Sequence, residues 1–268
     1  MRLDPWKAER VVSEVLRLDG VWTSFDRGHD RASVLEDVSL SVDAGEIVAV
    51  VGGGGQGKTT LIRLASGTLL PDRGRVCVNG VEVARLKDKQ MARVLAGDVG
   101  LATGTGPNAR ITVREYIEIA AAAPKEGWRR KWRRRERRRM ATAVLEDLGI
   151  SECASLRWEH LSDWQRVAVE LAQAVIVQPR LLLVDDIADG FGLGQKKAVM
   201  DLLEGFVRDH GCGVFMAVSD HASALRAVRV WQLQRRGLRL MANHSDDDVG
   251  DDERADVIPL PRRRSDAR

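Results

Sequence analysis

The chain has 268 residues, is 44% hydrophobic and carries a formal net charge of +3. This length suits one large domain, or a core with a subdomain, that buries a sizeable core. No apolar run approaches the ~18 residues that a bilayer-spanning helix needs, and we expect no signal peptide at the polar N-terminus. The three cysteines, Cys77, Cys153 and Cys212, lie far apart and form no metal-ligand spacing, which favours a reducing compartment.

The N-terminal part predicts a short extension followed by strands. Residues 1–13 are polar and form an N-terminal extension, and residues 15–22 and 34–42 alternate as strands do. The apolar run 47–51 reads as a buried parallel strand. Phe25 is expected just outside the first strand, where its ring either stacks on an adenine base or plugs the strand end.

A glycine-rich motif directly follows this buried strand and matches G-x-x-x-x-G-K-[ST]. Its residues are Gly52, Gly53, Gly54, Gly55, Gln56, Gly57, Lys58, Thr59 and Thr60. Glycines let successive backbone N–H groups point at phosphate oxygens, and the following helix adds its positive end. We expect Lys58 to reach the β- and γ-phosphates and the Thr59 hydroxyl to ligate Mg²⁺. The alternative, a glycine turn before an ordinary helix, does not explain why glycine, lysine and threonine all fall in register.

The middle of the chain predicts a hairpin, a short helix and a core strand. Residues 75–83 form the hairpin, with Asn79-Gly80 at its tip. Residues 86–95 read as the helix and 99–102 as the strand. Residues 103–109, rich in Gly, Thr, Pro and Asn, then form a loop.

A long helical stretch follows, from 113 to 178. Thr112 and Glu115 form a capping box at its start. Pro124 and Gly127 break the helix once, Gly149-Ile150 breaks it again, and Leu161-Ser162 restarts it with a second capping box between Ser162 and Gln165. Between Arg129 and Arg139 there are nine basic residues and one acid. This basic segment either contacts anionic lipid headgroups or an acidic partner, or is a solvated helix face. Because the positive charge is confined to one stretch, we expect no nucleic-acid binding.

The last third predicts two buried strands, a helix between them and a terminal hairpin. The apolar run 181–184 ends in Asp185 and Asp186, and in P-loop proteins this pattern supplies the aspartate on the Mg²⁺ side. Residues 200–207 read as helix and 214–218 as strand, before a hairpin of 230–233 and 238–240. Residues 243–268, acidic and then basic, read as a disordered tail.

This order of parts resembles the ATP-binding cassette (ABC) ATPases over about residues 14–240. The resemblance implies an α/β fold: a RecA-like P-loop NTPase core with an N-terminal antiparallel β-subdomain and an inserted helical subdomain at about 113–178, together spanning 14–242. It also implies ATP and Mg²⁺ as ligands, with Asp185 on the metal. A second ATP-binding subunit, identical or different, and membrane permease chains would be the partners. The chain would then lie in the cytoplasm, on the inner face of the cell membrane.

Five sites depart from the family pattern. The signature Leu-Ser-Gly-Gly-Gln is replaced by residues 161–165, where Asp163 and Trp164 oppose approach to a phosphate. Asp186 stands where the family has its catalytic glutamate. Asp220-His221 reverses the order of the switch histidine and its aspartate, so the Asp220 carboxylate would face the γ-phosphate. Gly104 and Gly192 occupy the positions of the Q-loop glutamine and the D-loop aspartate.

These departures, beside an intact glycine loop, predict a transporter subunit that binds MgATP and couples dimer closure to separate permeases. Hydrolysis would be weakened, with Asp186 as the one residual catalytic residue. Two alternatives stay open. One is a soluble, non-transport ABC protein with a regulatory or scaffold role, and the other is an ordinary homodimeric transport ATPase.

Overall fold

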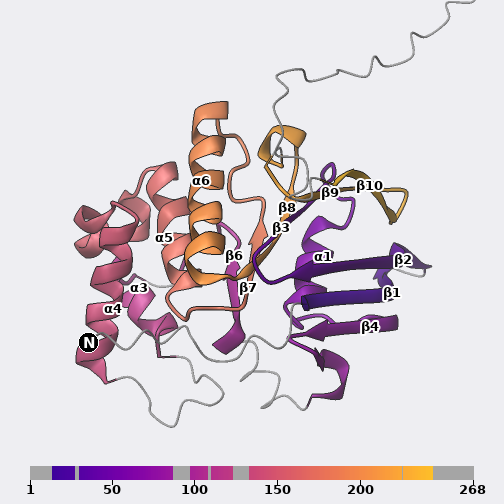
Figure 1. Ribbon diagram of the computed structural model, residues 1–268, viewed down its shortest axis with the longest axis horizontal. Coiled ribbons are helices and arrows are strands. Elements are labelled where there is room, and N and C mark those ends of the chain that lie inside the picture. The colour runs from indigo at the N-terminus through magenta and orange to yellow at the C-terminus, as the bar shows by residue number, and fades with distance from the viewer. Residues whose placement is uncertain are drawn as a thin grey trace, which may run out of the picture.

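The computed structural model describes residues 14–27, 30–86, 97–107, 110–122, 133–224 and 226–243. Figure 1 shows two sheets at one side of the molecule and a group of helices at the other. The expected N-terminal extension 1–13, nearly all of the helix 86–95 and the tail from 244 onward lie outside the described residues. So does the first part of the basic segment, up to residue 132.

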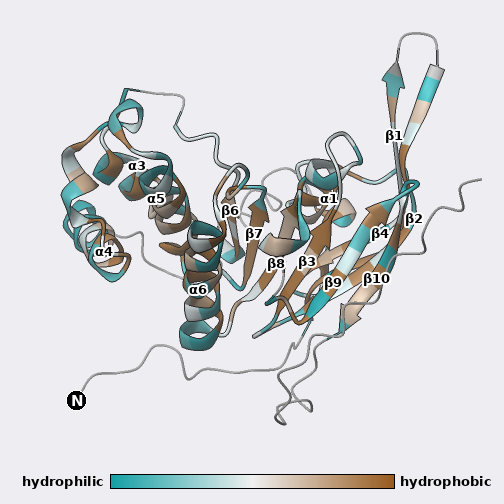
Figure 2. Ribbon diagram, turned by 90° about the horizontal axis from the view of Figure 1, so that it is seen from above, coloured by the Kyte–Doolittle hydropathy of each residue, from teal (hydrophilic) through white to brown (hydrophobic). Residues whose placement is uncertain are grey.

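The first sheet is antiparallel, with strand order β2-β1-β4-β5. Its strands are β1 (Glu14–Arg27), β2 (Asp30–Asp43), β4 (Arg73–Val78) and β5 (Val81–Glu82), followed by the short 3-10 helix η1 (Val83–Arg85). Asn79 and Gly80 form the β4–β5 turn with φ values of 49° and 76°, as Asn-Gly predicts. The β1–β2 hairpin projects beyond the sheet in Figure 2.

The second sheet has six strands in the order β10-β9-β3-β8-β7-β6. Its strands are β3 (Ile47–Val51), β6 (Val99–Ala102), β7 (Leu181–Asp185), β8 (Gly213–Val218), β9 (Arg229–Gln234) and β10 (Gly237–Asn243). All neighbouring pairs are parallel except β9 and β10, which form the predicted terminal hairpin. The carboxyl ends of β3, β7 and β8 therefore meet at one edge.

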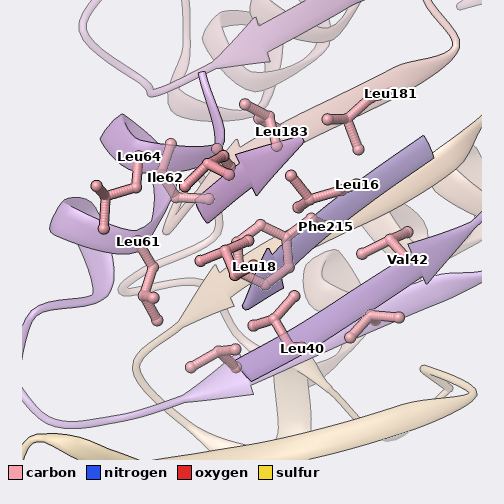
Figure 3. Close-up of a cluster of buried hydrophobic side chains, with 14 of the residues drawn as sticks. Leu16, Leu18, Leu40, Val42, Leu61, Ile62, Leu64, Leu181, Leu183 and Phe215 are labelled. Carbon is pink, nitrogen blue, oxygen red and sulfur yellow. The ribbon is translucent and has the colours of Figure 1, made fainter. Parts of the chain in front are cut away.

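Each face of this sheet is covered by different elements. On one face, α1 (Lys58–Ala65) and the antiparallel sheet enclose a core that includes Leu16, Leu61 and Phe215 (Figure 3). On the other face, α5 (Asp163–Val175) and α6 (Leu193–His210) pack over the opposite side chains of the same strands. Burial of both faces explains why these strands read as continuous apolar runs.

The helical region contains α3 (Val113–Ala120), α4 (Arg134–Asp147) and α5, with a third buried cluster between them. Both predicted capping boxes, at Thr112 and Ser162, are present. The predicted break at Gly149-Ile150 and the restart at Leu161-Ser162 are confirmed between α4 and α5. There the chain turns through two 3-10 helices, η2 (Ser151–Ser155) and η3 (Trp158–His160).

The helix α6 begins seven residues before the predicted start at residue 200. Its first turns carry Gly194, Gln195 and two lysines, so the apolar pattern begins late. The side chain of Gln195 reaches back to the backbone N–H of Gly192 and caps the helix start. After β8 comes one short 3-10 helix, η4 (His221–Ser223). Within the described residues, no helix combines the length and apolarity needed to span a membrane.

Candidate functional site

The glycine loop joins β3 to α1, and two of its glycines have left-handed backbone angles. Gly55 has a φ of 73° and Gly57 a φ of 108°. A Cβ atom at Gly57 would lie 2.9 Å from Cγ1 of Val34 in β2. The N–H of Gly52 donates to the carbonyl of Val218 and so ties the loop to the end of β8. Glycine is therefore required at position 57 both by conformation and by space.

Lys58 is buried at the start of α1, with its ammonium inside the loop. Its Nζ donates to the carbonyl oxygens of Gly52 at 2.7 Å and Gly53 at 3.4 Å, and to the Ser219 hydroxyl at 3.1 Å. It also lies 3.5 Å from Oδ2 of Asp186. These contacts hold the positive charge where the loop would receive phosphates, as the motif predicts.

The outer part of the loop is exposed and rich in donors. Residues 53–56 are all exposed, and the N–H of Gly53 donates to Oε1 of Gln56 at 2.9 Å. Behind them, Thr60 is half-buried in the first turn of α1. The side-chain oxygen of Gln56 thus accepts from a backbone N–H group of the loop, as a phosphate oxygen would. The loop and the start of α1 fit a bound polyphosphate.

Two oxygen ligands for a divalent cation lie together beside the loop. The Thr59 hydroxyl is hydrogen-bonded to the carboxyl of Asp185 at the end of β7. Burial raises the pKa of Asp185, the Thr59 hydrogen bond and Lys58 lower it, and the neighbouring charge of Asp186 raises it further. A hydroxyl and a carboxylate suit Mg²⁺, which takes its other ligands from phosphates and water. The described residues contain no group of three or more His, Cys, Asp or Glu side chains that would hold a metal alone.

Asp186 is held in place by β8 rather than free to face a nucleotide. Its φ is 52°, which is unusual for a residue with a side chain, and its N–H donates to the carbonyl of Ala217. Its carboxylate accepts from both the N–H and the hydroxyl of Ser219. Sequence reasoning missed Ser219, although this residue directly follows the apolar strand β8.

The expectation that Asp220 faces the phosphate position is wrong. Its carboxylate pairs with the ammonium of Lys196 in α6 at 2.6 Å. It also accepts from the N–H and hydroxyl of Ser223, and so caps the N-terminal end of η4. These hydrogen bonds, that of Lys196 foremost, lower the pKa of Asp220. His221 is exposed, as expected of a lone surface histidine.

At the start of α5, the two side chains that were expected to oppose approach to a phosphate, Asp163 and Trp164, lie in different surroundings. Asp163 projects into solvent with 80% of its side chain exposed and pairs with Arg166 at 3.3 Å. Trp164 instead packs against the core cluster between the sheet and α6. Of the two side chains that replace the family's glycines, only the carboxylate of Asp163 therefore stands out from the helix end.

The other two altered positions carry no side chain, as the sequence states. Gly104 has a φ of 71° and no neighbouring atom near its Cβ position, and Gly192 is the N-cap of α6. The loop around Gly104 is held by Glu170, a buried residue that sequence reasoning missed. The sequence signal that could have identified Glu170 is that it is a charged residue among the apolar residues of α5.

Phe25 lies inside β1, opposite Ala32 of β2, so its prediction as a residue outside the first strand is wrong. Its ring is half-buried and belongs to none of the three described core clusters. The strand continues because β2 is long enough to pair with it to the end of the hairpin.

The described part of the basic segment, from Arg133 to Arg139, lies at the start of α4 with most side chains exposed.

Known proteins share both the sequence pattern and the fold. The family model described as ABC transporter matches residues 35–189. The lipoprotein-releasing system ATP-binding protein LolD of Colwellia psychrerythraea is 26% identical over 88% of this chain and 89% of its own length. The phosphonates import ATP-binding protein PhnC of Alcaligenes faecalis is 33% identical over 77% of this chain and 74% of its own.

A solved dimeric structure of a bacterial ABC transporter cassette superposes with a TM-score of 0.77 at 21% identity. The match covers 85% of this chain and 98% of that one. At this identity the structural match supports the fold alone, whereas the family model covers more than half of the sequence. The chain therefore belongs to the ABC transporter family and has the P-loop NTPase fold of its ATP-binding cassettes.

Proposed function

We propose that this chain is an ATP-binding subunit of an ABC transporter that holds MgATP but hydrolyses it slowly. The proposal rests on the contacts that the side chains of Lys58 and Asp186 make. The lysine is placed for phosphates by the glycine loop, whereas the nearest carboxylate is bound to Ser219 and to that lysine. A site with this arrangement favours binding over water activation.

The binding residues are assigned from their positions around the loop. The glycine loop, residues 52–60, and the ammonium of Lys58 bind the phosphates, and Thr59 with Asp185 holds Mg²⁺. The ring of Phe25 lies outside the buried clusters and is assigned to the adenine base. Bound MgATP would draw this chain and a second cassette together.

Slow hydrolysis follows from the carboxylate that remains. Asp186 is one methylene shorter than glutamate, and its two oxygens already accept from Ser219. A general base displaced by about 1 Å loses on the order of 10²-fold in rate. No compensating base comes from the switch position, because Asp220 is paired with Lys196 and His221 is exposed.

The transport role rests on the relatives. Both named relatives are ATP-binding proteins of a release or import system. We accordingly assign separate membrane permeases and a second ATP-binding subunit as partners, with this chain on the inner face of the cell membrane. Because Asp163 exposes a carboxylate at the helix end that would face the partner's nucleotide, we favour a partner with an intact signature.

The test measures binding and turnover on the same purified chain. We expect saturable MgATP binding in a fluorescence titration, and phosphate release well below about 1 s⁻¹, the low end of ordinary enzyme rates. Loss of MgATP binding in the native chain would overturn the whole proposal. Turnover at or above that rate would overturn only the claim of slow hydrolysis.

The partners are tested separately, by co-purification from the native host. A hydrophobic permease and a second cassette in the purified complex would support the transport role. Recovery of RNA or of a soluble assembly without any membrane chain would instead indicate the non-transport alternative. An ATPase-competent homodimer would contradict the mixed pair.

A further inference from the structure

Glu170 is a buried carboxylate that plays no part in the nucleotide site as described. It lies in the middle of α5, with only 2% of the residue exposed. The described part of the chain gives it no lysine or arginine partner. Burying an ionisable side chain without a counter-ion is costly unless hydrogen bonds replace its lost water. Its hydrogen-bond partners therefore indicate what the residue does.

Those partners belong to the loop that leaves β6. Oε1 accepts from the N–H of Gly106 at 2.8 Å, and Oε2 accepts from the N–H of Thr103 at 3.3 Å. The N–H of Gly104 adds a further hydrogen bond, and the Tyr116 hydroxyl donates to Oε1 at 3.3 Å. One side chain thus accepts from three backbone N–H groups, those of residues 103, 104 and 106, in a loop that has no regular secondary structure.

An aromatic ring also packs against the loop, at Gly106. Gly106 has a φ of 64°, and a Cβ atom there would lie 2.3 Å from Cε2 of Trp158. The indole therefore lies directly against the glycine backbone. Trp158 in turn meets Tyr116 edge-on, with ring centroids 6.4 Å apart. The loop is enclosed between a carboxylate and an indole, and the phenol of Tyr116 contacts both.

The three enclosing side chains come from the helical region, whereas the loop begins at the parallel sheet. Glu170 lies in α5, Tyr116 in α3 and Trp158 in η3. Thr103 directly follows β6, which is the edge strand beside β7. The contacts therefore join the parallel sheet to the helical region, at the loop where the chain leaves β6. In Figure 2, β6 lies between the helices and the rest of the sheet.

We propose that Glu170 is a positioning residue that clamps the loop 103–106 to the helical region. The loop and the helical region then keep one arrangement whether or not nucleotide is bound. Since Thr103, Gly104 and Thr105 offer no long side chain, the loop is fixed by what holds its backbone. This clamp explains why a buried charge stands among the apolar residues of α5.

The test is hydrogen–deuterium exchange of the full chain, with and without MgATP. In the native chain we expect slow exchange of the amides of Thr103, Gly104 and Gly106, and no change on adding MgATP. In Glu170→Ala, which leaves those amides without acceptors, they should exchange about tenfold faster or more, while β7 amides stay as protected as before. Gln173→Ala is the matched control, because this half-buried residue lies on the same helix and makes no hydrogen bond to residues 103–106.

Two further variants separate a clamp from general stability. Glu170→Gln keeps one acceptor oxygen and should restore part of the protection. Gly106→Ala, which forces a Cβ against Trp158, should release the same amides although Glu170 is intact. The proposal is overturned if the loop in Glu170→Ala exchanges as in the native chain, if protection is lost equally in β7, or if MgATP changes loop exchange in the native chain.

Discussion

The ammonium of Lys58 lies 3.5 Å from the carboxylate of Asp186, inside the loop that is placed to receive phosphates. Two unit charges at about 4 Å attract by roughly 4 kcal/mol at the effective dielectric of a protein surface. An incoming phosphate therefore competes with Asp186 for the same cation. In the proposed function, Asp186 therefore weakens nucleotide binding as well as being a poorly placed base.

This competition makes Asp186→Asn an informative variant. We expect its MgATP affinity to rise by up to about tenfold, because a negative charge beside the phosphate position is removed. Phosphate release should change by less than about twofold, since in the proposed function Asp186 contributes little to a slow reaction. Titration with MgATP and a phosphate-release assay give the two values. Asp189→Asn, an exposed aspartate just after the site, is the control; a large fall in turnover for Asp186→Asn would show that the site is catalytically live.

Lys58→Ala should abolish MgATP binding. The measurement is thermal unfolding of the native chain and the variant, each with and without MgATP. At a ligand concentration of about 100 Kd, binding adds roughly 2.7 kcal/mol to the stability of the native chain. The variant should show no such shift in Tm, whereas Lys197→Ala, which removes an exposed lysine of α6, should keep it. An equal shift in Lys58→Ala would mean that the glycine loop is not the nucleotide site.

The parts of this structure that sequence predicts well are those fixed by neighbouring residues. The glycine loop, the Asn79-Gly80 turn and the two capping boxes each depend on contacts within a few positions, and all are present. The apolar strands of the second sheet are also confirmed, because burial on both faces leaves a continuous apolar run.

The contacts that sequence does not predict join distant residues. The hydrogen bond from Lys58 to Ser219 spans 161 positions, and that from Gly106 to Glu170 spans 64. The orientation of Asp220 depends on Lys196 in a helix whose start was itself placed too late. Motif position indicates which residue stands beside a nucleotide, but only the fold shows which way its side chain is held.

The two residues that replace the signature glycines should differ in their effect on stability. Trp164→Gly should lower the free energy of unfolding by roughly 2 kcal/mol, because the indole packs against the core cluster and its loss leaves a cavity. Asp163→Gly should cost less than about 1 kcal/mol, since that side chain is exposed and contributes mainly through the helix dipole. Urea unfolding measures both. Equal losses would show that Trp164 is not part of the core.

Glu170 predicts a specific dependence of stability on pH. Burial raises its pKa, while hydrogen bonds from the N–H groups of Gly106 and Thr103 and from Tyr116 oppose the rise. In the folded chain, Glu170 therefore stays protonated at pH values somewhat above the ordinary glutamate pKa of about 4.3. The stability that the protonated group contributes is complete below that pH and is lost as the pH rises through the folded pKa.

A comparison with Glu170→Gln isolates this effect, because glutamine does not titrate. We expect the native chain's advantage in urea midpoint over the variant to shrink as the pH rises above about 4.3 and through the raised pKa of Glu170. Tyr116 does not interfere, because burial raises its pKa far above this range. Glu146→Gln, which changes an exposed residue of α4, should show no such trend. If the advantage instead grows with pH, the loop N–H groups stabilise the carboxylate more than burial penalises it, and the direction assigned to this pKa is wrong.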